Sequence, residues 1–314
     1  MSPEAFQHVF EPHLRERIPR KPESLYRPVR DAIAAGGKRV RPYLTAIAAG
    51  GDPAEWLPTA VAVEFLHTFT LVHDDIMDNA ATRRGHPTVY VAYGVNTAIL
   101  AGDTIVSLAT LALAEARGDI QAALSLEFAR AFQAVCEGQA LDKEFESRND
   151  ISLAEYTTMI ELKTARMFEL AAVLGAITAK QPVEPFRRFA REIGLAFQLQ
   201  DDLLDLTGDE TLGKTIGGDI LEGKRTALFV LAMEQYQSLS HGNRSLMDRL
   251  RNRQTTREDI AGARQLFEEL GILMNVADLA ATHMRMAEEE LRSIDPLRRN
   301  ELLAFSDRLL KRSM

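Results

Sequence analysis

Apolar residues recur every three or four positions along most of this 314-residue chain. This spacing places them on one face of an α-helix, and the strict alternation of a half-buried strand is hard to find. Gly and Pro residues interrupt the periodic runs, and the connections between the runs are short, without a Ser/Gly-rich linker. The sequence therefore predicts an all-α fold, with one domain over residues 1–314 and helices packed around a central cavity.

The expected helices can be assigned to individual runs. They are Val61–Asp78, Asn96–Ala116, Ile120–Phe145, Leu153–Ala179, Glu184–Leu206, Thr226–Ser238, Arg257–Leu270, Leu273–Ile294 and Pro296–Leu310. Asn149 or Ser152 is suited to cap the start of the fourth run. The first run, and the fifth from Ile193 onward, are apolar nearly all round, which predicts that both helices are buried.

These two buried helices end in the same acidic pattern, Asp-Asp-x-x-Asp, at residues 74–78 and 201–205. Positions i and i+4 share a helix face, so Asp74 stacks with Asp78, and Asp201 with Asp205. Carboxylates stacked at the negative end of a helix dipole repel one another, and a cation removes that repulsion. Oxygen ligands favour hard ions, and magnesium completes its shell with water and substrate phosphates. One copy would equally fit a solvated acidic face. Two copies inside apolar runs predict a magnesium–diphosphate site, with the two motifs facing each other across the mouth of the cavity.

Basic residues near these motifs supply the charge that would balance a diphosphate. Residues 36–42 read Gly-Gly-Lys-Arg-Val-Arg-Pro. The paired glycines allow close backbone approach, and three cations in four residues suit a phosphate group. His67 lies seven residues before Asp74, on nearly the same helix face. Taken singly, the heptad also fits a solvated turn, and the histidine a core residue.

Together these elements resemble the trans-isoprenyl diphosphate synthases, also called polyprenyl synthetases. The matching motifs run in family order across about residues 36–225, and their combination is far more specific than any one of them. They are Gly36-Gly37-Lys38-Arg39-Val40-Arg41-Pro42, Glu64-Phe65-Leu66-His67, His73-Asp74-Asp75-Ile76-Met77-Asp78, Arg83-Arg84-Gly85, Gly138-Gln139-Ala140-Leu141-Asp142, Lys163-Thr164, Phe197-Gln198-Leu199-Gln200-Asp201-Asp202-Leu203-Leu204-Asp205, Gly213-Lys214, Gly218-Asp219 and Gly223-Lys224.

The resemblance implies a homodimeric, magnesium-dependent prenyltransferase. Such an enzyme condenses isopentenyl diphosphate head-to-tail with an allylic diphosphate (dimethylallyl, geranyl or farnesyl diphosphate). Carried over by position, the implied magnesium ligands are Asp74, Asp78 and Asp201, supported by Asp75, Asp202 and Asp205. The implied contacts to the allylic diphosphate are Arg83, Lys163, Thr164, Gln198, Lys214 and Lys224. Isopentenyl diphosphate would be held by Lys38, Arg41, His67 and Arg84. Asp74, Asp78, Asp201, Lys163 and Lys214 would carry the catalysis.

Two residues before the first motif bear on product length. Phe69 precedes Asp74 by five residues, which puts it roughly 7.5 Å deeper along the helix, and Thr70 lies beneath the aspartates. An aromatic residue followed by a small one, with no insertion inside residues 74–78, resembles family members that make the C20 product geranylgeranyl diphosphate. We therefore expect a C20 product, with C15 farnesyl diphosphate as the alternative. Phe69 could equally be a core residue without influence on length.

Two rival functions remain open. A class I terpene cyclase would share the aspartate-rich helix, but its second metal motif combines Asn or Asp with Ser/Thr and Glu, unlike residues 201–205. It would also have no need of the Lys38 and Arg41 site for a second diphosphate. A non-catalytic subunit of a heteromeric synthase would be expected to have lost some of these ligands, and all are present.

Composition and charge also indicate which partners and which cellular location to expect. A net charge of −8 argues against a general nucleic-acid surface. The single cysteine, Cys136, excludes an internal disulfide framework and is expected to be buried. The N-terminus lacks a basic segment followed by an apolar one, so no secretory signal is expected. The most apolar long stretch, Val95–Ala116, contains Asp103 and is predicted to be too short and too polar for a membrane span. A cytoplasmic protein is expected.

Overall fold

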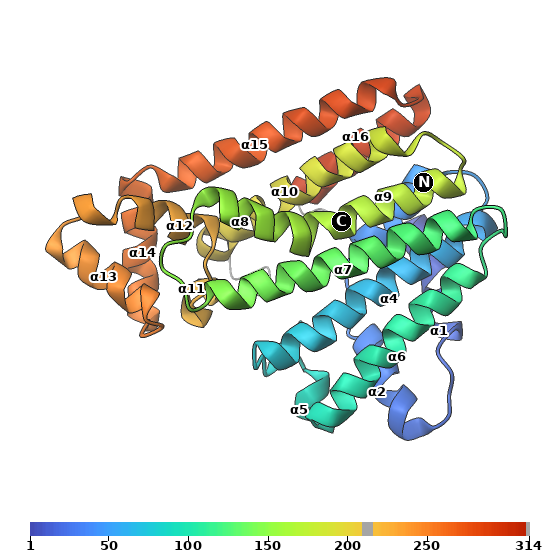
Figure 1. Cartoon of the computed structure of the whole chain (residues 1–314), viewed down its shortest axis with the longest axis horizontal. Coiled ribbons are helices and arrows are strands. Elements are labelled where there is room, and N and C mark those ends of the chain that lie inside the picture. The colour runs from blue at the N-terminus through green and yellow to red at the C-terminus, as the bar shows by residue number, and fades with distance from the viewer. Residues whose placement is uncertain (209–215, 312–314) are drawn as a thin grey trace. The chain divides into compact units, whose positions relative to one another are not determined.

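The computed structural model describes residues 1–208 and 216–311, which are mostly helical (Figure 1). The α-helices are α1 (Pro3–Glu16), α2 (Glu23–Ala34), α3 (Val40–Ala49), α4 (Pro53–Met77), α5 (Val89–Tyr93), α6 (Val95–Ala114), α7 (Gln121–Phe145), α8 (Leu153–Ile160), α9 (Arg166–Thr178), α10 (Val183–Thr207), α11 (Gly218–Glu222), α12 (Ala227–Glu234), α13 (His241–Arg251), α14 (Arg257–Glu269), α15 (Ile272–Glu290) and α16 (Pro296–Lys311). A π-helix η1 (Glu161–Ala165) and the 3-10 helices η3 (Tyr236–Ser238) and η4 (Leu291–Ser293) accompany them. The prediction of an all-α fold is confirmed.

Several features differ from the expected helices. Helices α1, α2, α3, α5, α11 and α13 lie in stretches where no helix was expected. The run expected as one helix over Leu153–Ala179 is interrupted by η1, which spans only five residues and is too short to be recognised from apolar spacing. A small antiparallel hairpin of β1 (Thr82–Arg83) and β2 (His86–Pro87) follows α4. Its two-residue strands are too short to show an alternating pattern. Ser152 caps α8 in a capping box with Glu155, as one of the two candidates predicted.

The chain forms two compact units, and each is described by itself. Unit 1 comprises Met1–Phe132, Met167–Ala190 and Glu290–Met314, and unit 2 comprises Gln133–Arg166 and Arg191–Glu289. The first acidic motif and residues 36–42 belong to unit 1, whereas the second acidic motif belongs to unit 2. That residues 1–314 act as one domain, with the two motifs facing each other, stays a prediction.

In unit 1, α4 packs against α3 and against α6, which runs alongside it (Figure 1). Residues 56–66 of α4 are all buried, so the helix is enclosed for most of its length before the acidic motif begins. This burial was predicted from its nearly continuous apolar sequence. The enclosed stem fixes where the aspartates at the end of the helix lie relative to α3.

Helix α6 corrects one prediction. Its 20 residues, Val95–Ala114, are long and apolar enough to cross a membrane, contrary to the expectation drawn from Asp103. The same composition occurs in core helices of soluble proteins. Ala98, Ala101 and Ile105 of α6 are buried in unit 1. Cys136, predicted to be buried, is exposed on α7.

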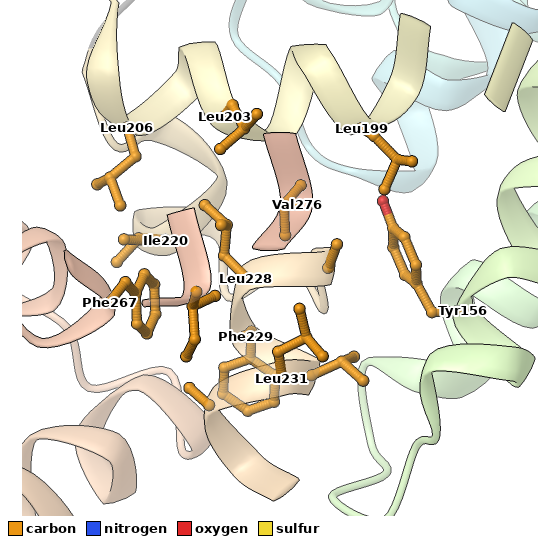
Figure 2. Close-up of a cluster of buried hydrophobic side chains, with 14 of the residues drawn as sticks. Tyr156, Leu199, Leu203, Leu206, Ile220, Leu228, Phe229, Leu231, Phe267 and Val276 are labelled. Atoms are coloured by element: carbon orange, nitrogen blue, oxygen red, sulfur yellow. The ribbon is translucent and has the colours of Figure 1, made fainter. Parts of the chain in front are cut away.

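A separate apolar core supports the second acidic motif in unit 2 (Figure 2). Leu199, Leu203 and Leu206 project from α10 into this core, at the i, i+4, i+7 spacing of one helix face. They meet side chains from several other helices of the unit, among them Tyr156, Leu228, Phe229, Phe267 and Val276. This packing fixes the rotation of α10 and hence the direction of its aspartates.

Candidate active site

The first acidic motif lies at the C-terminal end of α4, where Asp78 is the C-cap. Asp74 and Asp78 are half-buried and share a helix face with His67 and Thr70, as predicted. Asp75 points elsewhere. It is only 4% exposed and accepts a hydrogen bond of 2.8 Å from Arg83 Nε. Burial raises the pKa of Asp75, and Arg83 opposes that rise. Asp75 thus holds the hairpin against α4, while Asp74 and Asp78 remain the stacked pair.

A cation–histidine contact lies about two turns before Asp74. Arg41 Nη1 is 3.1 Å from His67 Nε2. Because a guanidinium can only donate, Nε2 of His67 is the acceptor and carries no proton. Burial, and then the neighbouring Arg41, hold the pKa of His67 well below its usual value of 6.5. The guanidinium of Arg41 also stacks over the ring of Phe168, 4.8 Å from its centroid. A neutral histidine and an aromatic ring therefore orient Arg41.

A second arginine, Arg84, lies against the glycine loop that precedes α3. Gly37 has φ +150, and a Cβ at this position would lie 2.6 Å from Arg84 Nη1. Only a glycine lets the hairpin arginine lie this close to the backbone. Lys38, the next residue, is exposed. The structure thus brings together Arg41 with His67, and Arg84 with the loop that carries Lys38, which are the four residues predicted for isopentenyl diphosphate. Arg39, the third cation of the heptad, faces inward.

The residues predicted to limit product length lie beneath the first motif. Phe69 is 8% exposed. Its ring is 4.5 Å from that of His73 and meets the ring of Phe132 edge-on at 5.2 Å. Thr70 is half-buried, and its hydroxyl donates to the carbonyl oxygen of His67 at 2.8 Å. Phe132 on α7 was not singled out from the sequence, since no local pattern shows which aromatic residues will meet in space.

A cavity of about 320 Å³ lies on a different face of α4. Thr68, Leu71, Val72 and Asp75 line it from α4, at i, i+3, i+4 and i+7. Residues of α2, α5 and the hairpin complete its wall. Asp74, Asp78 and His67 do not line this cavity, so it is not the space that the aspartate pair faces.

In unit 2, the two outer aspartates of the second motif, Asp201 and Asp205, lie on one face of α10, as predicted. Gln198 shares this half-buried face. Asp205 Oδ2 accepts from the backbone nitrogen of Asp219 at 3.1 Å. Asp219, on α11, also lies 3.6 Å from Lys224 Nζ. The contact of Asp219 with Asp205 was not predicted, because the two residues are 14 positions apart and no helical spacing connects them.

Asp202 is enclosed, unlike its neighbours. It is 2% exposed and accepts hydrogen bonds from the hydroxyl of Tyr156, from Ala227 N at 2.9 Å and from Gln198 Nε2 at 3.0 Å. Burial, and then the charge of Asp219, raise the pKa of Asp202 to about 7. Three donors on an enclosed carboxylate point to a residue that fixes the second motif in place.

The π-helix η1 presents Lys163 and Thr164. Lys163 Nζ donates to Asp142 of α7, and the hydroxyl of Thr164 donates to Gln198 Oε1 at 2.9 Å. Gly138 of α7 makes this approach possible, since a Cβ there would be 2.4 Å from the backbone nitrogen of Lys163. π-Helical turns are frequent at functional sites. Lys163, Thr164 and Gln198 are thus brought together as predicted, and Lys214 lies outside the described residues.

The carboxylate oxygens of the two motifs suit a hard cation whose remaining ligands come from a substrate. In the part of the chain that the structure describes, no three acidic, His or Cys side chains gather into a metal site. Each motif instead offers a pair of carboxylates on one helix face. Magnesium in proteins is commonly bound by one or two carboxylates, with waters and substrate phosphates as the other ligands.

Comparison with known proteins identifies the family. The sequence matches the polyprenyl synthetase family over residues 22–269, most of the chain.

The chain is a member of the polyprenyl synthetase family. It is 37% identical to a geranylgeranyl diphosphate synthase of Methanosarcina mazei over 302 residues, which cover 93% of this chain and 91% of the relative. It is 40% identical to a short chain isoprenyl diphosphate synthase of Methanocaldococcus jannaschii over 256 residues, covering 79% and 77%.

A solved structure agrees with this polyprenyl synthetase assignment. The geranylgeranyl pyrophosphate synthetase of Pyrococcus horikoshii matches with a TM-score of 0.87 and 34% identity, covering 98% of this chain and 97% of that one. Polyprenyl synthetases generally use a divalent metal ion. The family resemblance predicted from the motifs and the fold predicted with it are therefore confirmed.

Proposed function

We propose that this protein is a magnesium-dependent trans-prenyltransferase that joins isopentenyl diphosphate head-to-tail to an allylic diphosphate. The observation that carries the proposal is the arrangement along α4. Its residue His67 holds the phosphate-binding candidate Arg41 at 3.1 Å, and the carboxylate pair Asp74 and Asp78 follows on the same face. A cation beside one face of a buried helix, with a carboxylate pair further along that face, suits one substrate bound through its phosphates and another bound through metal ions.

In this proposal, Lys38, Arg41 and Arg84 bind isopentenyl diphosphate through charge-assisted hydrogen bonds, and neutral His67 orients Arg41. The allylic diphosphate is bound by Arg83, Lys163, Thr164, Gln198, Lys214 and Lys224. Metal ions are held by Asp74, Asp78, Asp201 and Asp205. Asp75 and Asp202 support these sites through Arg83 and Tyr156.

Magnesium at these carboxylates would supply positive charge that offsets the charge developing on the leaving diphosphate. The C–O bond of the allylic diphosphate breaks, and its electron pair leaves with the diphosphate. The double bond of isopentenyl diphosphate then forms the new C–C bond, and a proton is lost. The lysines and arginines hold the released diphosphate in place, where it is the candidate acceptor of that proton. Apolar side chains such as Phe69 exclude water from the cation-like carbon.

We propose geranylgeranyl diphosphate as the product, with farnesyl diphosphate as the alternative. The support is the edge-on pair of Phe69 and Phe132, which lies below the motif where a growing chain would end. The relatives named geranylgeranyl diphosphate synthases agree with this length.

We also propose a cytoplasmic homodimer in which residues 1–314 act as one domain. Support for the dimer comes from large apolar side chains exposed on α6, namely Ile99, Leu100 and Leu111, which are 41%, 58% and 61% exposed. Exposed apolar patches often mark protein–protein interfaces, and we propose that these side chains belong to one.

A turnover assay tests the central proposal. Purified protein is given isopentenyl diphosphate and each of dimethylallyl, geranyl and farnesyl diphosphate in magnesium, and the products are separated by chromatography. Linear prenyl diphosphates are expected. Cyclic hydrocarbons formed from the allylic substrate alone would establish the cyclase alternative. Activity that appears only after a second subunit is added would establish the non-catalytic alternative.

A further inference from the structure

Arg39 is the most buried of the three cations in residues 36–42. It is 5% exposed, although Lys38 beside it is exposed. Arg39 Nε donates to Glu11 Oε1 at 2.7 Å, Nη1 donates to Glu64, and Nη2 donates to the carbonyl oxygen of Ile33 at 2.9 Å. All three guanidinium nitrogens are therefore used inside unit 1, and the role of this arginine differs from that of a phosphate ligand.

The backbone of Arg39 is held in an unusual conformation. Its φ of 50 and ψ of 39 place it in the left-handed region, which a side chain other than glycine rarely adopts. It follows two glycines with positive φ, and its carbonyl oxygen accepts from Tyr43 N at 3.1 Å to begin α3. The chain therefore turns sharply at Arg39 and enters the helix that carries Arg41. The guanidinium contacts hold a turn that local preference alone would not keep.

Glu64 links this turn to the opposite side of the site. It is 4% exposed on α4 and lies three residues before His67, on the adjoining turn of the helix. Burial raises the pKa of Glu64, and the charges of Arg39, Arg41 and Arg84 oppose that rise. One buried carboxylate thus offsets cations that would otherwise repel one another. Glu11 adds a second carboxylate from α1.

We propose that Arg39, held by Glu64 and Glu11, is a positioning residue that sets Lys38 and Arg41 for isopentenyl diphosphate. The inference rests on the proposed function and concerns one of its two substrates. Arg39 fixes the turn between Lys38 and the first residues of α3, so that the cations are in place before the diphosphate arrives. A misplacement of about 1 Å at such a site can cost on the order of a hundredfold in rate. Lysine cannot replace it fully, since an ammonium lacks the planar fork that serves three acceptors.

Steady-state kinetics of four variants tests this inference, with each substrate varied separately. Arg39→Gln should raise KM for isopentenyl diphosphate by about tenfold to a hundredfold and change KM for the allylic diphosphate by less than about twofold. Arg39→Lys should give a smaller rise for isopentenyl diphosphate. Glu11→Gln removes one of the two carboxylates at a site that is 26% exposed, and should raise the same KM by about twofold to threefold.

The matched control is Arg30→Gln. Arg30 forms a surface pair in unit 1, with Nη2 2.8 Å from both carboxylate oxygens of Glu23. Its kinetics should equal those of the wild type. If Arg39→Gln fails to fold because Glu64 is left unpaired, the KM values of Arg39→Lys and Glu11→Gln for isopentenyl diphosphate still test the positioning role.

The possible failures are distinct. If wild type and control turn over normally while folded Arg39 and Glu11 variants keep their KM for isopentenyl diphosphate, the positioning role is wrong and the proposed function stands. Equal changes in KM for both substrates would also overturn it, because a general loss of structure would explain them. If wild-type protein joins no isopentenyl diphosphate to any allylic partner, the proposed function and this inference both fall.

Discussion

Shortening the aromatic side chain beneath the first motif should lengthen the product. The perturbation is Phe69→Ala. Phe69 is 8% exposed, with Phe132 edge-on at 5.2 Å and His73 at 4.5 Å. If a prenyl chain grows down α4 from the aspartates, this ring lies roughly 7.5 Å below Asp74 along the helix.

The expected magnitude follows from the volume removed. Phe→Ala deletes about six carbon atoms, close to the five of one isoprene unit, so the main product should gain at least one unit. The same deletion should lower the free energy of unfolding by roughly 3–5 kcal/mol, as for other buried Phe→Ala changes. Loss of the edge-on contact contributes about 0.5–1.5 kcal/mol beyond the buried area.

Products made from radiolabelled isopentenyl diphosphate, dephosphorylated and separated by reversed-phase chromatography, measure the change. Phe10→Ala is the matched control. Phe10 is fully buried on α1 in the same unit and stacks on Phe6 at 4.9 Å. It should lose comparable stability and keep the wild-type product. A folded, active Phe69→Ala enzyme with unchanged product length would show that Phe69 does not limit the chain.

Four further predictions test other parts of the site. Asp74→Ala should lower turnover in magnesium by orders of magnitude with an unchanged circular dichroism spectrum, and near-normal rates would rule out a metal role. Gly138→Ala should lower kcat at least about tenfold, because its Cβ would lie 2.4 Å from a backbone nitrogen of η1, whereas Gly118→Ala, with open space around it, should be neutral. The pKa of His67 is lowered in the folded state, so the unfolded chain binds more protons below pH 6.5. Chemical denaturation should therefore show stability falling as pH drops below that value, and His67→Gln should reduce this dependence. Leu111→Asp should convert a dimer into monomers in sedimentation equilibrium, and a dimer that survives would exclude this face of α6 as the interface.

The sequence alone was enough to predict most helices from Val61 onward and to propose the site residues. Helical periodicity is local, so the runs that became α4, α7 and α10 could be placed to within a few residues except near α4's start. The stacking of Asp74 with Asp78 also follows from helix geometry alone. The family resemblance then ordered the motifs, and the comparisons confirmed it.

Other features could not be predicted because they depend on which side chains meet. Neighbouring aspartates of one motif differ in burial, since Asp202 contacts Tyr156 and Ala227 while Asp201 does not share that enclosure. The exposure of Cys136 and the π-helix before α9 were likewise missed. Apolar spacing reports which face of a helix is buried on average, and it does not report what that face contacts.

The basic heptad at residues 36–42 shows most clearly which properties follow from local sequence and which depend on tertiary structure. Its sequence determined that two glycines are followed by three cations in four residues, which is a local property of residue type and order, whereas helix α3 after it was not expected. The tertiary structure decided that Arg39 serves Glu11 and Glu64, whereas Arg41 reaches His67. The physical reason is that an arginine's role depends on the nearest carboxylates and on its access to water. Both are set by α1 and α4, which come from other parts of the chain.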